Sequence, residues 1–365
     1  MARQRARELG LPLQGETGRW NAITDVPGVE VGYRTIRRED LWPAVRTGVT
    51  AILPFGRSGP LRPAWAGSFA LNGNGEMTGL HWVRDGGYFL GPVCLTNTHS
   101  VGIVHHAAVR WMIETHRETF TEQHIWAMPV VAETYDGVLS DVLGQRVTEE
   151  DALQAIAAAS GGAVAEGSVG GGTGMICYGY KGGSGTSSRR VRLGAVEGVV
   201  GAFVQANFGR PDLLQVCGVP VGRLMSPTAA EPELGSVIAV VATDLPMLPH
   251  QLGRVARRAA LGIARTGSSG GNSSGDIFLA FSTANAMPLP IAAGDLLRFD
   301  ALNDELFDPV YEAVCQAVEE SVLNALSAGE AMTGVRPAGR QVPALDGERL
   351  LGVMRRYAAL APQED

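Results

Sequence analysis

This sequence of 365 residues lacks the patterns that mark several broad classes of protein. No run approaches the eighteen or so consecutive apolar residues that a membrane span needs, and no apolar segment follows the basic N-terminal residues. Acidic residues outnumber basic ones, and the net charge of −7 argues against nucleic acid as a partner. We therefore expect a cytoplasmic protein that binds neither a membrane nor nucleic acid.

Cysteine and metal-binding motifs are also scarce. The four cysteines stand singly in apolar surroundings, at positions 94, 177, 217 and 315, which predicts buried free thiols. The HExxH motif is absent, and the helical stretch with His99, His105 and His106 has no acidic residue at ligand spacing. We expect neither a metal nor an organic cofactor; a hydrolase with an added His-bound metal is one alternative.

Glycine, in contrast, is abundant, with 48 residues. The glycines concentrate in five clusters, at residues 71–79, 85–87, 166–174, 181–185 and 267–275. Such clusters let backbone amides approach a ligand closely, so they suggest an active site built from loops. No GK[ST] sequence or dinucleotide fingerprint accompanies them, which argues against nucleotide binding and leaves structural support or oxyanion contacts as their roles.

Apolar runs of strand length alternate with amphipathic stretches. We predict strands at residues 47–53, 91–96, 127–132, 199–206, 236–243 and 277–283, and helices at 98–119, 148–159, 249–265, 304–326 and 348–360. Most of the strands are continuously apolar, which is typical of a sheet buried on both faces. Neighbouring strands often lack an intervening helix, so a layered α+β fold is favoured over a doubly wound parallel sheet.

The junction between Gly235 and Ser236 is the most informative position. A polar, proline-bearing segment, residues 226–234 (SPTAAEPEL), runs directly into the apolar run that begins at Ser236. Such a segment is a place where chains are processed. Cleavage there would give Ser236 a free α-amine with a pKa near 7.7–8.0, able to accept the proton of its own hydroxyl. The alternative is an ordinary turn that leads into a core strand.

Other polar residues stand where predicted strands end or begin. Glu133 and Tyr135 follow one strand, where a carboxylate could bind a substrate ammonium and a phenol could donate to an oxyanion. Asn207 ends another, and its side-chain amide suits an oxyanion hole. Ser274 and Asp276 precede a third and could orient a nucleophile or relay its proton. Each of these residues is also compatible with an ordinary turn or surface position.

Taken together, these segments resemble the L-aminopeptidase/D-amidase-esterase family of self-processing N-terminal-serine hydrolases, also called the DmpA-like or β-peptidyl aminopeptidase family. The resemblance covers nearly the whole chain. It is carried by residues 20–25 (WNAITD), 71–79 (LNGNGEMTG), 97–106 (NTHSVGIVHH), 131–137 (VAETYDG), 170–175 (GGGTGM), 204–207 (VQAN), 234–236 (LGS) and 274–278 (SGDIF).

The resemblance implies a four-layer αββα sandwich, similar to the N-terminal nucleophile hydrolases with different connectivity. It also implies self-cleavage between Gly235 and Ser236, into an α-chain of residues 1–235 and a β-chain of residues 236–365. By the same resemblance Ser236 is the nucleophile, and the family's other site positions are matched by five residues: Asn207 and Tyr135 at the oxyanion, Glu133 at the substrate amine, and Ser274 with Asp276 as helpers.

Some relatives carry Glu where this chain has Asp276, which bears on how directly that carboxylate reaches Ser236.

The implied activity is release of N-terminal residues from short peptides, aminoacyl amides and esters through an acyl-enzyme, by a homotetramer of αβ units. An uncleaved protein that binds a small anion in its glycine-rich loops is the alternative from another class. A denaturing gel would separate the two hypotheses.

Overall fold

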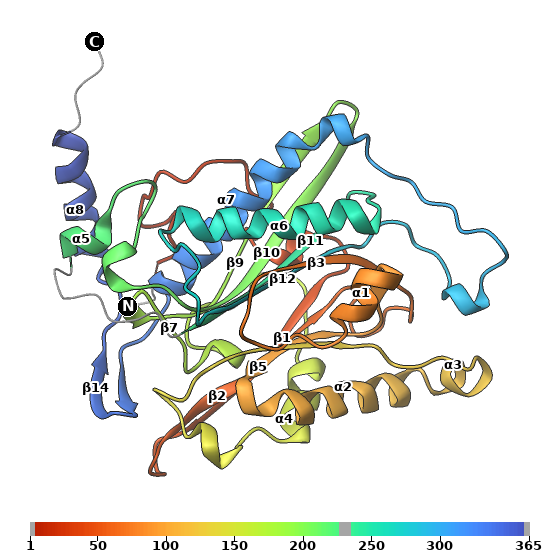
Figure 1. Cartoon of the computed structure of the whole chain (residues 1–365), viewed down its shortest axis with the longest axis horizontal. Helices are drawn as coiled ribbons and strands as arrows, with labels where there is room; N and C mark the ends of the chain where they lie inside the picture. Colours follow the sequence, from red (N-terminus) through yellow and green to blue (C-terminus); the bar gives the residue numbers. More distant parts are fainter. Residues whose placement is uncertain (1–3, 226–234, 361–365) are drawn as a thin grey trace.

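The computed structural model of the chain describes residues 4–225 and 235–360. Two β-sheets lie face to face, with helices on the outer face of each (Figure 1). The smaller sheet has the order β1 (Glu30–Arg38), β2 (Val45–Leu53), β5 (Val93–Asn97) and β6 (Val130–Thr134). The larger sheet has the order β4 (Tyr88–Phe89), β3 (Ala64–Gly73), β12 (Gly275–Ser282), β11 (Ser236–Thr243), β10 (Val196–Asn207) and β9 (Gly183–Leu193).

Helices cover both outer faces. The smaller sheet is covered by α2 (Val101–Thr115) and α4 (Glu149–Ala157), and the larger by α6 (Pro249–Arg265) and α7 (Asp308–Ser327). The remaining helices are α1 (Leu80–Gly86), α3 (Arg117–Glu122), α5 (Val221–Met225) and α8 (Gly347–Leu360), and two small strand pairs are β7 (Ile176–Cys177) with β8 (Tyr180–Lys181) and β13 (Met332–Val335) with β14 (Ala338–Val342). The predicted αββα sandwich is therefore confirmed.

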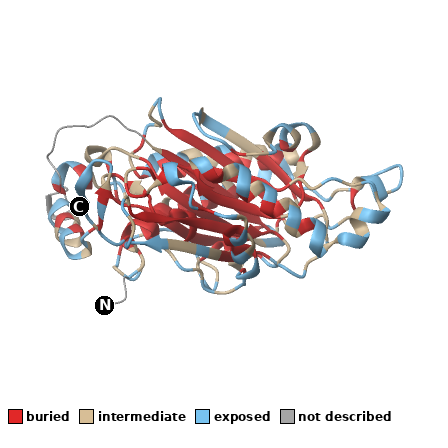
Figure 2. Ribbon diagram, turned by 90° about the horizontal axis from the view of Figure 1, so that it is seen from below, coloured by how far each residue is buried: buried red, intermediate tan, exposed pale blue. Residues whose placement is uncertain are grey.

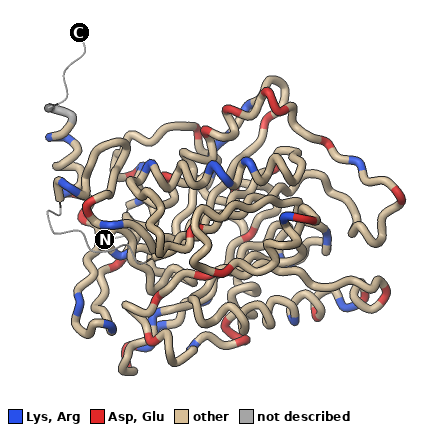
Figure 3. The backbone as a smooth tube through the Cα atoms, viewed as in Figure 1, with Lys and Arg blue, Asp and Glu red and all other residues tan. Residues whose placement is uncertain are grey.

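The apolar core has three layers, one between the sheets and one under each pair of helices. The buried residues run through the centre of the molecule (Figure 2), whereas most charged residues lie around its periphery (Figure 3). Ile238 and Val240 of β11 belong to the layer between the sheets, while Val237 and Ala239 face the helices. Because side chains alternate along a strand, Ser236 lies on the same face as Ile238, toward the other sheet.

Most predicted elements are present with small changes of boundary. The predicted helix 98–119 is wrong as a single element: it begins with a 3-10 turn at Thr98–Ser100 and is interrupted at His116, between α2 and α3. Parallel pairing occurs in β5 with β6 and in β11 with β12, and the other pairings within the two large sheets are antiparallel. This pattern agrees with the preference for α+β over a doubly wound sheet.

Strand β9 was not predicted, because its sequence, GSGTSSRRVRL, is polar. Its first seven residues are nevertheless buried. Thr186 Oγ1 donates to Ala202 O at 2.7 Å, and Ser187 Oγ donates to Ala317 O at 2.6 Å. The hydroxyl groups therefore keep their hydrogen bonds inside the protein, which makes their burial tolerable.

Candidate active site

Ser236 is the first residue of β11 and is only 4% exposed. Its two strand neighbours are Asn207, the last residue of β10, in the antiparallel pair and Gly275, the first residue of β12, in the parallel pair. The residue that precedes it, Gly235, accepts a hydrogen bond through its carbonyl from the Gly275 N–H at 3.2 Å. The Gly235 carbonyl and the Ser236 hydroxyl thus belong to one ordered sheet edge.

Asn207 is fixed by two hydrogen bonds to the main chain. Its Oδ1 accepts from Ile176 N at 2.9 Å, and its Nδ2 donates to Tyr135 O at 3.0 Å. The side chain is 95% buried and joins the ends of β10 and β6, strands of different sheets. Asn207 is paired with Ser236 in the strand register, so the two side chains lie on the same face of the sheet, and a role of the second Nδ2 hydrogen as an oxyanion donor stays a prediction.

Tyr135 lies beside Asn207, but through its carbonyl group rather than its hydroxyl. The phenol ring folds back over Gly137, where an added Cβ would overlap the Tyr135 hydroxyl, and the residue is 42% exposed. In this conformation Tyr135 orients Asn207. A role of its hydroxyl as an oxyanion donor stays a prediction.

Glu133 lies within β6, not after it, and is buried. Thr98 Oγ1 donates to one carboxylate oxygen, and Glu76 N donates to the other at 3.1 Å. Burial raises the pKa of Glu133, and the hydrogen bonds from Thr98 and Glu76 oppose that rise. Such a carboxylate gains from the arrival of a cation, which suits the proposed ammonium contact.

The first glycine cluster joins Glu133 to the Ser236 neighbourhood. A Cβ placed on Gly75 would lie 3.1 Å from Glu133 Oε1, 3.5 Å from Gly275 Cα and 3.7 Å from Ile277 Cδ1, so Gly75 lies close to both Glu133 and Gly275. Thr78 N donates to Val131 O at 2.9 Å, which holds this loop against the free edge of β6. The first glycine cluster therefore lies between Glu133 and Gly275, the strand neighbour of Ser236.

Ser274 and Asp276 form a buried pair: Ser274 Oγ donates to Asp276 Oδ1 at 2.6 Å. Asp276 pairs with Val237, which faces the helices, so Asp276 lies on the sheet face opposite to that of Ser236. Asn72 Nδ2 approaches the other Asp276 oxygen at 3.4 Å. Asp276 is thus hydrogen-bonded to Ser274, and the helper roles of both residues stay predictions.

The glycine run 166–174 is a packing element. Residues Gly170–Gly172 form a buried 3-10 turn between the sheets, and an added Cβ on Gly171 would overlap Gln205 Oε1. The amides of Gly170 and Gly171 donate to Thr35 Oγ1 at 2.8 Å and to Thr50 Oγ1 at 3.1 Å. These amides are therefore not available to a phosphate, and the structural role is the correct one.

Sequence reasoning missed several buried polar residues around the site. Gln205 of β10 crosses the gap between the sheets, with Nε2 donating to Thr134 Oγ1 at 2.7 Å and to Thr96 O at 3.0 Å. Asp136 is fully buried, and Asn97 Nδ2 donates to it at 3.1 Å. Burial raises the pKa of Asp136 to about 6. The only sequence signal for Gln205 and Asn97 was a polar residue inside an apolar run.

The histidines do not converge. His99 Nδ1 contacts Val142 O at 3.3 Å, and within residues 4–225 and 235–360 no group of three or more His, Cys, Asp and Glu side chains is placed to hold a metal. The same residues contain no helix with the length and apolar character to cross a bilayer. The predicted free thiols occur, although Cys217 is only partly buried.

Known proteins resemble this chain along nearly its whole length. It is 45% identical over 378 residues to the beta-peptidyl aminopeptidase BapA of Sphingosinicella microcystinivorans (98% of this chain, 93% of the relative). It is 51% identical to the L-aminopeptidase D-Ala-esterase/amidase of Ochrobactrum anthropi, whose structure is described as a new variant among the Ntn hydrolase fold, with a TM-score of 0.93 and coverage of 98% and 99%. A beta-aminopeptidase of Burkholderia sp. is 43% identical, with a TM-score of 0.89 and coverage of 98% and 100%.

The family assignment rests on the sequence profile as well as on these relatives. The profile of peptidase family S58 matches residues 21–340, which include Glu133, Asn207, Ser236 and Ser274. The match thus spans both sheets and the strand edge at which the candidate residues meet. The chain belongs to peptidase family S58, a family of serine-type hydrolases with an N-terminal nucleophile.

Proposed function

We propose that this protein cleaves itself between Gly235 and Ser236 and then acts as an aminopeptidase and amidase. It releases N-terminal residues from short peptides, aminoacyl amides and esters, and it uses no metal or organic cofactor. The observation that carries the proposal is the position of Ser236 at the buried start of β11, between Asn207 and Gly275. The relatives named as aminopeptidases and as an esterase/amidase support it.

Self-cleavage begins when Ser236 Oγ attacks the Gly235 carbonyl carbon. The amide C–N bond breaks, the Ser236 nitrogen takes up a proton and becomes a free amine, and the resulting ester is hydrolysed by water to leave a Gly235 carboxylate. The Gly275 N–H, already 3.2 Å from the Gly235 oxygen, is placed to stabilise the oxyanion. Ser274, hydrogen-bonded to Asp276, supplies a candidate proton relay before the amine exists.

Glycine at position 235 fits this step. An added Cβ would overlap the Asn207 carbonyl oxygen and lie 2.9 Å from Phe208 Cα. A larger residue would displace the Gly235 carbonyl from the end of β10, and with it the bond to be cleaved.

In the mature enzyme the Ser236 amine accepts the hydroxyl proton while Oγ attacks the carbonyl of the substrate's first residue. Asn207 Nδ2, and by the family resemblance the Tyr135 hydroxyl, donate to the oxyanion. The Ser236 ammonium then protonates the leaving amine, and water hydrolyses the ester. Glu133 binds the free amine of the substrate and so restricts cleavage to the first residue.

A denaturing gel of the purified protein tests the processing step. Cleavage predicts two bands of about 25 and 14 kDa, in proportion to 235 and 130 residues of the 38.4 kDa chain, with Ser236 at the N-terminus of the smaller one. Ser236→Ala, the matched control, should give one band and no hydrolysis of aminoacyl p-nitroanilides. Intact wild-type protein that hydrolyses them all the same would refute the mechanism. A panel of L-α-, D-α- and β-aminoacyl anilides would then define the substrate class.

A further inference from the structure

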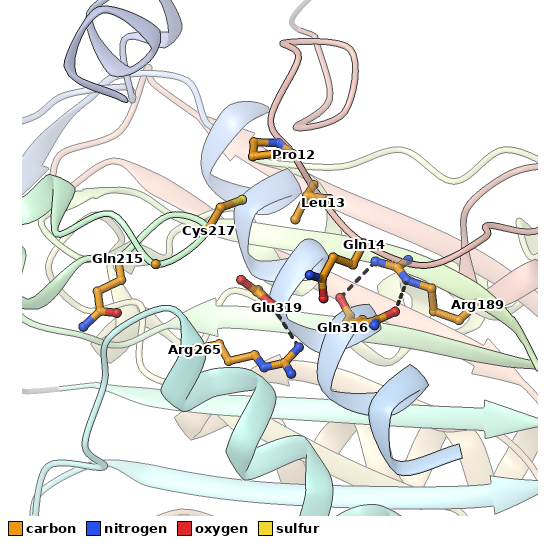
Figure 4. A pocket seen from close by; sticks show the side chains of 10 residues that line it. Pro12, Leu13, Gln14, Arg189, Gln215, Cys217, Arg265, Gln316 and Glu319 are labelled. Carbon is orange, nitrogen blue, oxygen red and sulfur yellow. Dashed lines mark hydrogen bonds and ion pairs between the residues drawn. The ribbon is translucent and has the colours of Figure 1, made fainter. Parts of the chain in front are cut away.

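A second site lies on the helix-covered side of the larger sheet. It is a cavity of about 380 Å³ between the N-terminal segment 12–14, the loop 215–218, the end of α6 and the outer part of α7 (Figure 4). None of the candidate active-site residues lines it. Its volume lies within the range of about 300–1,000 Å³ that is typical of small-molecule sites.

Two opposite charges lie side by side on the wall of this cavity. Arg265 Nη1 and Glu319 Oε2 are 3.4 Å apart, at the outer limit of hydrogen-bond distance (Figure 4). Glu319 is the sole hydrogen-bond partner of the Arg265 guanidinium among the described residues, and most N–H groups of this guanidinium therefore face the cavity or solvent without a protein acceptor. Both groups retain capacity to bind a further charged partner.

The inner wall adds positive charge. Arg189 is 1% exposed and donates to the fully buried Glu320 at 2.7 Å, and Arg7 donates to the same carboxylate at 2.9 Å. Of these three residues only Arg189 lines the cavity; it shares the single Glu320 carboxylate with Arg7, so a ligand carboxylate at this wall would meet an excess of positive charge. Burial also raises the pKa of Glu319 against the opposing effect of Arg265, and a ligand ammonium beside Glu319 would favour its carboxylate form.

The rest of the wall fits a small, partly apolar body. Leu13 and Cys217 supply apolar surface, and the side-chain amides of Gln14 and Gln215 supply hydrogen-bonding groups around it. We propose that this cavity binds a free amino acid or a dipeptide as a zwitterion, its carboxylate on Arg265 and its ammonium on Glu319. A free amino acid would also be the product of the proposed function, and that identification rests on the proposed function. The expectation of a zwitterionic ligand rests on the charges of the cavity alone.

Main-chain contacts join the two segments beside the cavity to each other. Gln215 N donates to Thr266 O at 2.8 Å, and an added Cβ on Gly267 would overlap the Leu213 carbonyl oxygen. The segment with Gln215 follows β10, which ends at Asn207. The segment with Thr266 leads to Ser274, directly before β12. An occupant that contacts both Arg265 and Gln215 would therefore hold together the segments that carry two candidate catalytic residues.

Calorimetry and thermal unfolding with β-alanine as the probe test the site. Glu133→Gln serves as the background, because it removes the ammonium partner at the active site. β-Alanine should bind this protein and raise its Tm by about 2 °C or more near saturation, whereas propionate and propylamine, which each carry one of its charges, should bind far more weakly. Adding Arg265→Gln or Glu319→Gln should weaken β-alanine binding about tenfold or more. Adding Arg84→Gln, which changes an exposed arginine paired with Asp85, is the matched control and should have no effect.

Cys217 gives a readout that needs no substitution. It lines the cavity and is partly buried, whereas the other three cysteines are buried. β-Alanine should slow alkylation of Cys217 in the wild-type enzyme, as followed by peptide mass spectrometry at alkaline pH. The proposal is overturned if β-alanine neither binds the Glu133→Gln protein nor protects Cys217, or if binding survives both cavity substitutions. Failure of the proposed function would instead appear as an uncleaved chain or inactivity toward aminoacyl anilides, with β-alanine binding at the cavity intact.

Discussion

The Asn207 side chain makes structural hydrogen bonds and is also the proposed oxyanion donor, so a single substitution can change both. Its Oδ1 accepts from Ile176 N and its Nδ2 donates to Tyr135 O, while the second Nδ2 hydrogen is the proposed oxyanion donor. Replacement by alanine would remove the structural acceptor together with the proposed catalytic donor. A carboxylate at this position keeps the acceptor toward Ile176 N, but it lacks both the hydrogen bond to Tyr135 O and the proposed oxyanion donor.

Asn207→Asp should therefore lower kcat by about 10²–10³-fold, the usual cost of one oxyanion donor, while the fold is retained. Single-turnover kinetics with an aminoacyl p-nitroanilide measure this loss, and circular dichroism provides the control for folding. A kcat within a few-fold of the wild-type value would remove Asn207 from the oxyanion site.

The raised pKa of Glu133 predicts a pH dependence of substrate binding. Glu133 must be ionised to hold an ammonium, and burial keeps it protonated up to a higher pH than an exposed glutamate. KM should therefore rise as the pH falls, beginning above the ordinary titration range of glutamate. KM measured against pH tests this expectation, and Glu133→Gln should have a high KM that no longer changes over this range. If KM of the Glu133→Gln variant still rose at the same acidic pH, the rise would belong to another titrating group.

At the scale of elements, close backbone contacts fix how the helices sit on the sheets. Helix α6 crosses β3 at Gly67, where an added Cβ would lie 2.6 Å from Gly253 Cα. Helix α7 crosses β9 at Gly185, where an added Cβ would lie 2.8 Å from Ala325 N. The glycines let the helix and strand backbones approach each other closely, so these two positions fix how the helices pack on the sheet.

The two glycines at the crossing of α6 and β3 make a matched pair. Gly67→Ala should destabilise the protein by about 1–3 kcal/mol, because the new methyl group meets the α6 backbone. Gly253→Ala should be neutral or slightly stabilising, since nothing lies within 4 Å of its added Cβ and alanine is the better helix former. Chemical denaturation compares the two variants, and equal stabilities would contradict the close contact.

At the scale of the whole molecule, the assembly remains a proposal drawn from the family resemblance. A homotetramer of αβ units would have a mass of about 154 kDa, four times the 38.4 kDa chain, because self-cleavage removes no residues. Light scattering coupled to size exclusion measures this mass directly. A species near 38 kDa at micromolar concentration would show instead that the αβ unit is a monomer.

The sequence predicted the layered fold and named the candidate residues, but it did not predict which groups these residues contact. Continuous apolar runs predicted β11 and β12, whereas the polar strand β9 was missed because its hydroxyl groups are satisfied by groups far away in the sequence, such as Ala202 O, Ala317 O and Asp25 Oδ2. Glu133 and Asn207 were named from their places near strand ends and from the family motifs, yet Gln205, Thr98 and Asp136 were not. Their partners lie on other strands and could not be read from local sequence.

The sequence alone determined which side chains are available, including a serine at the start of an apolar strand and glycines where the backbone must pass closely. Alternation along β11 even set the face on which Ser236 lies. Only the tertiary structure decided that Gln205 reaches Thr134 and Thr96 across the gap between the sheets, that Tyr135 holds Asn207 through its carbonyl, and that Arg265 and Glu319 share a cavity. The physical reason is that these contacts join residues of separate strands, loops and helices, whose distance is set by the packing of sheets and helices and not by their spacing along the chain.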